Sequence, residues 1–236
     1  MSLMSAGLMR NLFIVVIGVA VVGVVVYLAR KRLRRKKWHD LAGHLHFRFM
    51  DEDGKGPDGK LCATEEDLAL VKSLSFKCLS GGYHLNVLIG EAQQKSVVLA
   101  DYVEESSPTI HSRTRRSYRT VCAVVDKELD LPSCHVSSSG RILEAVNRMA
   151  GGQDVNFGDD PTFSKAFLVE GQDEDAIRSF LSQRLRNRFV ALARTSVDFE
   201  SRGSTFAFHY GKLIRPSNAE AMIKVAFDFL ALLKKA

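Results

Sequence analysis

The stretch LFIVVIGVAVVGVVVYLA, residues Leu12–Ala29, carries no charged side chain and is followed directly by the basic run RKRLRRKK, residues Arg30–Lys37. Thirteen of its 18 residues are Leu, Ile, Val or Phe. An α-helix rises about 1.5 Å per residue, so these residues reach roughly 27 Å, close to the bilayer hydrocarbon thickness of about 30 Å. The sequence therefore predicts a transmembrane helix at Leu12–Ala29, with the rest of the chain on one side of the membrane.

A cleaved signal peptide is the main alternative for this apolar run. A signal peptide has positive charge before a shorter apolar run and a small-residue cleavage site after it. Here Arg10 is the only Lys or Arg before the run, whereas seven of residues 30–37 are Lys or Arg. This arrangement favours an uncleaved single-pass anchor. Because basic residues beside a span stay in the cytoplasm, we expect residues 1–11 outside the cell (inner) membrane and residues 30–236 in the cytoplasm.

The basic excess of the chain is confined to its first 37 residues. The net formal charge is +6, but residues 1–37 hold eight Lys or Arg and no Asp or Glu, which leaves residues 38–236 slightly acidic. Nucleic acid is therefore not an expected partner. The basic run is either a topology signal alone or also a contact for a bilayer that contains anionic lipids. The predicted lipid-contacting residues are Arg30, Lys31, Arg32, Arg34, Arg35, Lys36 and Lys37.

The residues after the basic run have the pattern of a sheet with few helices. Trp38–Ala42 is predicted to continue the anchor as a short helix that ends at Gly43, and His44–Met50 alternates as a half-buried strand. Thr64 precedes three acidic residues, which is typical of a helix start. Further strands are predicted at Phe76–Leu79, His84–Gly90, Val97–Val103 and Tyr118–Asp126, and their short loops favour an antiparallel meander.

The second half repeats these elements in another order. Strands are predicted at Cys134–Ser137 and Phe163–Glu170, and a hairpin pairs Ser196–Glu200 with Thr205–Tyr210. Helices are predicted at Arg141–Met149, at Asp173–Ala193 and from Ser217, where Glu220 completes a capping box.

The fold class is therefore α+β: one N-terminal transmembrane helix, then a soluble domain of antiparallel sheet or sheets with packed helices. Pro132 suggests a boundary between two α+β subdomains, although the sequence does not decide between one domain and two. The predicted organisation is a short external N-terminus at 1–11, the span at 12–29, a basic linker at 30–37, and subdomains at 38–131 and 132–236.

The loop Gly54–Lys60 satisfies both G-x-G-x-x-G and G-x-x-x-x-G-K, which are patterns of phosphate-binding loops. Leu61 stands where a Ser or Thr should coordinate magnesium, acidic residues crowd the loop, and no helix follows at once. A solvated loop is the better interpretation. A calcium loop that starts at Asp51 lacks its closing Glu, because Cys62 stands there.

Other catalytic and metal-binding patterns are equally weak. His44 and His46 would share one strand face and Cys134 adjoins His135, but no spacing resembles a zinc site. No G-x-S-x-G is present, although a triad assembled in space leaves no local signature. No catalytic residue, cofactor or metal ligand is predicted, and an enzyme is less expected than a non-enzymatic protein.

A second basic cluster lies in the loop before a predicted strand and comprises Arg113, Arg115, Arg116 and Arg119. It is a candidate for binding an anionic partner. The alternative, a solvated hairpin tip, is favoured because charge is common on exposed loops. Arg184, Arg186 and Arg188 end a predicted helix that opens with acidic residues, so they are interpreted as complements to the helix dipole.

Several short motifs occur in the order typical of a known group of proteins. They are Asn86–Gly90, Asp101-Tyr102, Arg113–Arg116, Thr120-Val121, Leu131-Pro132 and Phe163-Ser164. On these motifs the chain resembles a poorly characterised bacterial family of single-pass, membrane-anchored proteins with a cytoplasmic α+β domain. It departs from the family pattern at Ala100, where an aromatic residue usually precedes the Asp, and at Val103-Glu104. The resemblance implies a membrane-tethered domain and no particular activity.

Three functional hypotheses follow from the sequence. The first is a non-enzymatic, membrane-tethered interaction module that acts as a scaffold or accessory subunit, with protein partners in the membrane or at its cytoplasmic face. The second is a domain that senses anionic lipids through Arg30–Lys37 and Arg113–Arg119. The third is an enzyme whose site is formed only in the folded chain.

Overall fold

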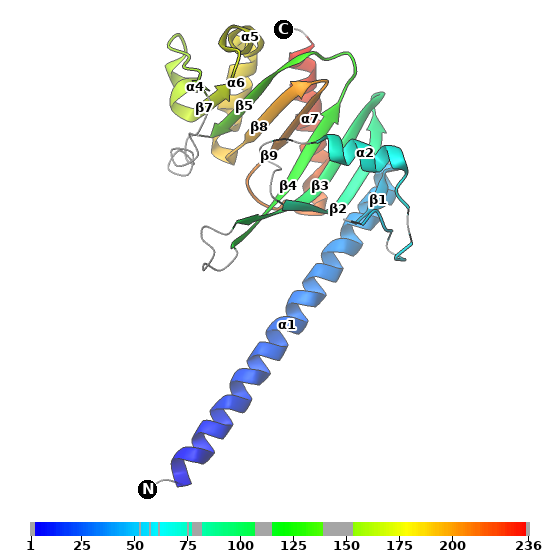
Figure 1. The fold of residues 1–236 in the computed structure, drawn as a ribbon, viewed down its shortest axis with the longest axis vertical. Helices are drawn as coiled ribbons and strands as arrows, with labels where there is room; N and C mark the ends of the chain where they lie inside the picture. The colour runs from blue at the N-terminus through cyan, green and yellow to red at the C-terminus, as the bar shows by residue number, and fades with distance from the viewer. Residues whose placement is uncertain are drawn as a thin grey trace.

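The longest element of the protein is helix α1, which spans Leu3–Leu45. The computed structural model describes residues 3–51, 53–56, 58–60, 62–74, 76, 82–106, 115–138 and 153–234. With 43 residues, α1 is about 64 Å long, and Figure 1 shows it projecting from the sheet as a straight rod. Within the described residues it is the one helix long and apolar enough to cross a membrane. The predicted span lies in the projecting part, where its side chains are exposed.

Nine strands of the described residues form one sheet in which every pairing is antiparallel (Figure 1). Their order across the sheet is β1-β2-β3-β4-β9-β8-β5-β7-β6. The prediction of an α+β fold with an antiparallel sheet is confirmed. The strands are β1 (Arg48–Met50), β2 (Gly82–Ala92), β3 (Lys95–Ser106), β4 (Arg115–Val125), β5 (Leu131–Ser138), β6 (Gln153–Asp154), β7 (Phe167–Gly171), β8 (Asp198–Gly203) and β9 (Thr205–His209).

The sheet runs without interruption through both halves of the chain. β4 pairs with β9, β9 with β8, and β8 with β5. The proposed boundary at Pro132 falls inside β5, and Ser201 Oγ on β8 donates a hydrogen bond to the Pro132 carbonyl oxygen at 2.9 Å. Strands from residues 38–131 and 132–236 thus share one sheet.

Helices cover the two faces of the sheet unequally. The C-terminal part of α1, together with α6 (Gln183–Leu192) and α7 (Ala219–Leu233), packs on one face through the larger core cluster. The smaller α2 (Glu65–Ser73) packs on the other face over β1–β4. Successive strand residues point to opposite faces, so that Val97 and Leu99 belong to the larger cluster and Val98 to the smaller.

The start of the sheet differs from its prediction because α1 ends later than Gly43. His46 has the left-handed φ of 56°, and the Phe47 and His46 N–H groups bond to the carbonyl oxygens of Ala42 and Gly43. These two bonds form a Schellman motif, which closes the helix at Leu45. The predicted strand is therefore wrong over residues 44–47. The helix start at Thr64 is confirmed, because Thr64 and Asp67 exchange the two bonds of a capping box.

Three elements of the second half also differ from their predictions. Phe163 lies in the short helix α4 (Pro161–Ala166), which Asp160 caps, so the strand begins only at Phe167. The helix predicted at 173–193 breaks at residues 181–182 into α5 (Glu174–Phe180) and α6, and the 3₁₀ turn η3 (Ala193–Thr195) follows.

The last helix begins at Ala219 after the 3₁₀ turn η4 (Pro216–Asn218), so a capping box at Ser217 is wrong. The predicted helix Arg141–Met149 and most of Phe76–Leu79 lie outside the described residues.

Arg186 explains why the chain turns between α5 and α6. Its side chain, 8% exposed, donates to Asp160 Oδ2 at 3.1 Å, to Asp159 Oδ2 at 2.8 Å and to the Leu181 carbonyl oxygen at 3.0 Å. The last bond satisfies a carbonyl that the helix break leaves without a helical partner. The interpretation of Arg186 as a dipole complement is therefore wrong, because Arg186 lies near the start of α6 and pairs with Asp159 and Asp160.

Replacing Arg186 by methionine should reduce the free energy of unfolding by about 3 kcal/mol, because Asp160 and the Leu181 carbonyl lose their buried donor. Urea denaturation of the full-length protein in detergent would measure it. The control is Arg184→Met on the exposed side of the same helix, for which a change within about 0.5 kcal/mol is expected. Equal effects of the two substitutions would contradict the assigned role of Arg186.

Candidate functional site

The domain is attached to α1 through a buried apolar stripe on the helix. Trp38 and Ala42 are 0% and 2% exposed and belong to the larger core cluster. They lie four residues apart and therefore on one side of the helix. Because Arg34 stands one further turn towards the span, it lies on the same side. The helix that carries the predicted span is thus part of the core of the domain.

Arg34 fixes α1 to the centre of the sheet. Its Nε and Nη2 atoms each lie 2.7 Å from a carboxylate oxygen of Asp101 on β3, and the Asp101 side chain is 4% exposed. Arg34 Nη1 also donates to the Ile214 carbonyl oxygen at 2.9 Å. A bidentate arginine–carboxylate pair fixes orientation as well as distance.

Two neighbouring strands hold Asp101 in place for Arg34. Asn86 Nδ2 on β2 donates to Asp101 Oδ2 at 2.9 Å, and Thr120 Oγ1 on β4 donates to Asp101 Oδ1 at 2.8 Å. Asn86 has the left-handed φ of 48° within an irregularity of the β2–β3 pairing. The Ile214 N–H in turn donates to Thr120 Oγ1 at 3.0 Å. We call Asn86, Asp101, Thr120 and Ile214, with Arg34 and Trp38, the junction.

The glycine-rich loop at residues 51–63 packs against the next residue of α1. Arg35 Nη2 donates to Asp51 Oδ2 at 3.1 Å and to the Gly56 carbonyl oxygen at 3.0 Å. Gly54 and Gly56 are buried, so the interpretation of this loop as simply solvated is incomplete. Its carbonyl oxygens and acidic side chain face a cation of the helix, the reverse of a phosphate-binding arrangement.

The basic run thus divides into two groups. Arg34 and Arg35 are half-buried and bind the domain, whereas the side chains of the other five cations, Arg30, Lys31, Arg32, Lys36 and Lys37, are exposed. Arg30 and Lys37 line a groove of about 710 Å³ between α1 and the segment 215–217. We call it the juxtamembrane groove; it is lined by Arg30, Leu33, Arg34, Lys37, Asp40, Leu41, Arg215, Pro216 and Ser217.

Arg215 is a residue of this groove that the sequence did not indicate. It is an isolated cation in a loop before Pro216, with no basic neighbour in the chain except Lys212 three residues earlier. Only the folded chain brings it beside α1, through the bond between Arg34 and Ile214. No local sequence signal could have placed it there.

The second basic cluster is largely neutralised by acidic residues of the neighbouring strand. Arg116 Nε lies 2.8 Å from Glu105 Oε1, and Arg119 Nη1 lies 3.1 Å from Glu104 Oε2. The Arg119 guanidinium also stacks 5.1 Å from the centre of the Tyr102 ring. Arg115 is exposed at the start of β4, and Arg113 lies outside the described residues. Glu104 and Glu105 were visible in the sequence, but their partners follow from the register of β3 and β4.

A histidine between two carboxylates forms a charged cluster on the other half of the sheet. His135 Nδ1 on β5 lies 3.0 Å from Glu170 Oε2, and its Nε2 lies 2.8 Å from Asp198 Oδ1. Burial acts to lower the pKa of His135, but the hydrogen bonds to Asp198 and Glu170 raise this pKa to about 10. Because the ring holds its proton at neutral pH, it is a fixed cation and a poor general base.

The raised pKa of His135 predicts that stability falls at alkaline pH. A raised folded-state pKa stabilises the protein fully below the unfolded value of about 6.5, and this contribution is lost as pH rises towards about 10. Between pH 6.5 and 8.5 the free energy of unfolding should drop by about 2 kcal/mol. Urea denaturation at a series of pH values measures the drop, which His135→Gln should abolish. An unchanged slope in this variant would contradict the assignment.

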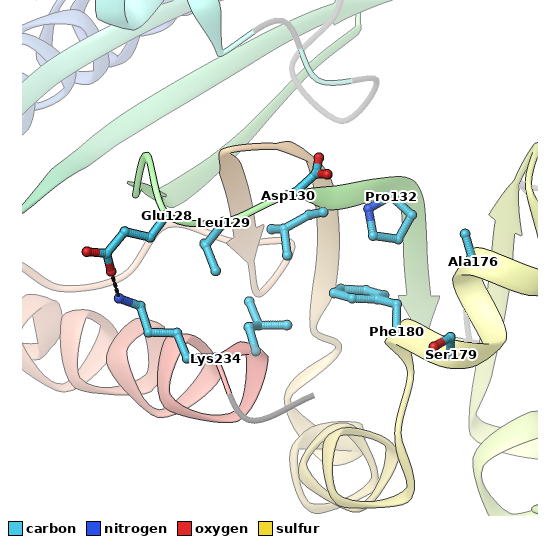
Figure 2. Close-up of a pocket in the computed structure, with 10 residues that line it drawn as sticks. Glu128, Leu129, Asp130, Pro132, Ala176, Ser179, Phe180 and Lys234 are labelled. Atoms are coloured by element: carbon cyan, nitrogen blue, oxygen red, sulfur yellow. Dashed lines mark hydrogen bonds and ion pairs between the residues drawn. The ribbon is translucent and has the colours of Figure 1, made fainter.

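A second groove, of about 730 Å³, lies between the ends of α5 and α7 and the start of β5. Figure 2 shows Phe180, Leu129 and Pro132 around it and the ion pair of Glu128 with Lys234 on its rim. Figure 1 places these elements at the end of the domain far from the projecting part of α1. The lining of this groove mixes apolar side chains with Asp130 and with Glu128 and Lys234, which pair with each other.

Potential nucleophiles and metal ligands are dispersed or buried. Burial raises the pKa of Cys122 to about 12 and, with a smaller effect of Glu200, that of Cys134 to about 12, so both thiols are unreactive. His44 lies in α1, so it does not share a strand face with His46. Within the described ranges, no group of three or more His, Cys, Asp or Glu residues is arranged to hold a metal ion.

Comparison with known proteins shows that this chain has a fold similar to that of a solved structure. No protein-family model matches the sequence, and no curated protein matches it. A solved structure, the crystal structure of the mycobacterial trehalose monomycolate transport factor A, TtfA, is similar with a TM-score of 0.53 and 13% sequence identity. The similarity covers 85% of this chain and 92% of that chain. At this identity the two proteins share a fold, and the likeness extends over most of both chains.

Proposed function

We propose that this protein is a non-enzymatic accessory subunit or scaffold of a membrane complex. In this proposal α1 anchors it as a single-pass protein of the inner membrane, with the N-terminus outside and the sheet domain in the cytoplasm. The positive charge that follows the span supports this orientation. The unbroken helix from the span to Leu45 supports an uncleaved anchor, because a signal peptide is followed by a cleavage site of small residues.

The observation that carries the proposal is the junction. A domain on a flexible linker samples many orientations and loses that freedom whenever it binds. Here Arg34 and Trp38 attach the domain to the span without a linker, so one set of surfaces faces any partner in the same membrane. A fixed orientation of the domain helps a scaffold to bind partners in the same membrane. It gives no advantage to an enzyme whose substrate diffuses freely.

The shared fold is compatible with this role. The similar protein is a mycobacterial transport factor, and an accessory factor for transport would work at a membrane. We therefore place a membrane transport complex first among the complexes to test, with protein partners in the membrane or at its cytoplasmic face.

The test is to make the link flexible without altering the domain. A Gly-Ser-Gly-Ser-Gly insertion between Ala29 and Arg30 keeps the span and the junction but separates them by a flexible linker. The full-length protein and this variant are purified from native membranes in mild detergent, and the masses of their complexes are compared. We expect a stoichiometric membrane-protein partner with the wild type and its loss with the insertion.

The matched control is the same insertion at Ser5, ahead of the span, which should leave the complex intact. An equal complex with both insertions would contradict the role of the junction. A wild-type protein that purifies alone from its native membrane, or that turns over a substrate unaided, would contradict the accessory function itself.

A further inference from the structure

We propose that the juxtamembrane groove binds the phosphate-bearing headgroup of an anionic phospholipid from the leaflet in contact with the domain. The proposal rests on the membrane placement proposed above, and it adds a specific lipid site to it. Arg215 is a member of this site that lies far from the basic run in sequence.

The charges of the groove favour an anion. Four cations line it, and Arg34 is neutralised by Asp101. In the part of the chain that the structure describes, Arg30, Lys37 and Arg215 form no ion pair. The one acidic residue of the lining is Asp40, which stands about one turn beyond Lys37 and about 15 Å further from the span than Arg30 along the helix.

The position of the groove matches the depth of lipid headgroups. Arg30 follows the last residue of the span directly, and Lys37 lies two helical turns later on the same side, about 10 Å along the axis. The headgroup layer of one leaflet is roughly 5–8 Å thick, so the cations between these residues stand at or just above it. An anion bound here would be at the membrane surface rather than in bulk solvent.

Apolar surface beside these cations favours a lipid over free phosphate. Leu33 in the groove is 54% exposed, and Leu213, two residues before Arg215, is 36% exposed. Outside the span, the described residues have just one other large hydrophobic side chain that is exposed, Tyr118. Exposed leucines beside cations suit the boundary between headgroup and acyl chain, where a soluble phosphate would gain nothing from them.

The groove is built before any ligand arrives. The Ile214 carbonyl oxygen accepts from Arg34, and the Ile214 N–H donates to Thr120, so the backbone beside Arg215 is held by the junction. Pro216 restricts the chain on the other side of Arg215. A preformed site loses less conformational freedom on binding, which favours a defined lipid over a diffuse attraction.

The experiment titrates lipid onto the full-length protein in detergent and counts bound lipid by native mass spectrometry. Phosphatidylglycerol, phosphatidylcholine and inorganic phosphate are the three probes. We expect one phosphatidylglycerol per protein at low lipid, little phosphatidylcholine, and no displacement by millimolar phosphate. Lys37→Gln combined with Arg215→Gln should weaken phosphatidylglycerol binding roughly 30-fold, the effect of removing two cations near a lipid surface.

The control removes the same charges elsewhere: Lys127→Gln combined with Arg184→Gln, both exposed and far from the groove, should leave binding unchanged. Lys37→Arg combined with Arg215→Lys should retain it, and a thermal unfolding curve confirms that each variant is folded. Equal binding by the glutamine pair and the wild type would overturn the site. Displacement by phosphate would overturn the lipid as its ligand. Neither result depends on a protein partner, so the accessory function would stand or fall separately.

Discussion

The Trp38→Ala variant should lose about 3–5 kcal/mol of the free energy of unfolding, the range found when a large aromatic side chain is removed from a core. Trp38 is fully buried and joins α1 to the larger core cluster. Its loss would leave a cavity between the helix and the sheet that neighbouring side chains can fill only in part. Trp38 is the single tryptophan of the chain, so the variant has no tryptophan fluorescence to report its unfolding. Circular dichroism during urea denaturation in detergent should therefore be used to follow the transition in both proteins.

Lys36→Ala is the matched control for this prediction. Lys36 is exposed on the same stretch of α1, and alanine favours the helix at either position. A change within about 0.5 kcal/mol is expected. If Trp38→Ala cost no more than this control, α1 would not be part of the core, and the domain would have to be regarded as loosely tethered.

Removing either partner of the Arg34–Asp101 pair is also expected to destabilise the protein strongly. Asp101→Asn leaves the guanidinium without its counter-charge and should cost about 3 kcal/mol, at the lower end of the range for buried pairs because the Arg34 side chain is 23% exposed. Arg34→Gln should cost about as much. The double variant should lose about 2 kcal/mol less than the sum of the two single losses, because the partners act as a unit.

The fluorescence of the wild-type Trp38 ring offers a direct readout of this pair. The Arg34 guanidinium lies 5.6 Å from the centre of that ring, so changes at Arg34 or Asp101 should alter its emission in the folded state. The control is Arg32→Gln, whose side chain is exposed. Strict additivity of the two single losses would show that Arg34 and Asp101 do not interact, contrary to the junction described above.

The elements that were predictable from the sequence are those with strong local signals. The β-rich composition of His84–Gly90, Val97–Val103 and Tyr118–Asp126, the Thr64 capping box and the turn around Gly203 all act within a few residues, and the structure confirms the elements they predict. Where residues distant in sequence decide the outcome, the local pattern failed: Asp159 and Asp160 hold the Arg186 side chain in place. Arg186 stabilises a break in a helix that the apolar period predicts to be continuous, because it satisfies the Leu181 carbonyl.

The site shows the same division. The basic run is evident in the sequence as charge, but its pattern does not distinguish its members. In the structure Arg34 pairs with Asp101 of the sheet, whereas Arg30, one turn nearer the predicted span, lines the groove. The four-residue spacing of Arg34, Trp38 and Ala42 predicts which side of the helix faces the sheet, because Trp38 and Ala42 are apolar and lie on one side. The partners of Arg34 are Asp101 on β3 and the Ile214 carbonyl in a loop, and only the tertiary structure identifies them.

In the membrane placement proposed above, the unbroken α1 also sets the rotational orientation of the domain about the membrane normal. Each residue of an α-helix turns the chain by about 100°, and the junction prevents the sheet from slipping around the helix. One residue inserted between Ala29 and Arg34 would therefore rotate the entire sheet by about 100° relative to the span. Seven inserted residues make close to two full turns and would restore the orientation of the sheet to within roughly 20°. The number of residues in this short stretch, more than their chemistry, decides which side of the domain faces a neighbour in the membrane.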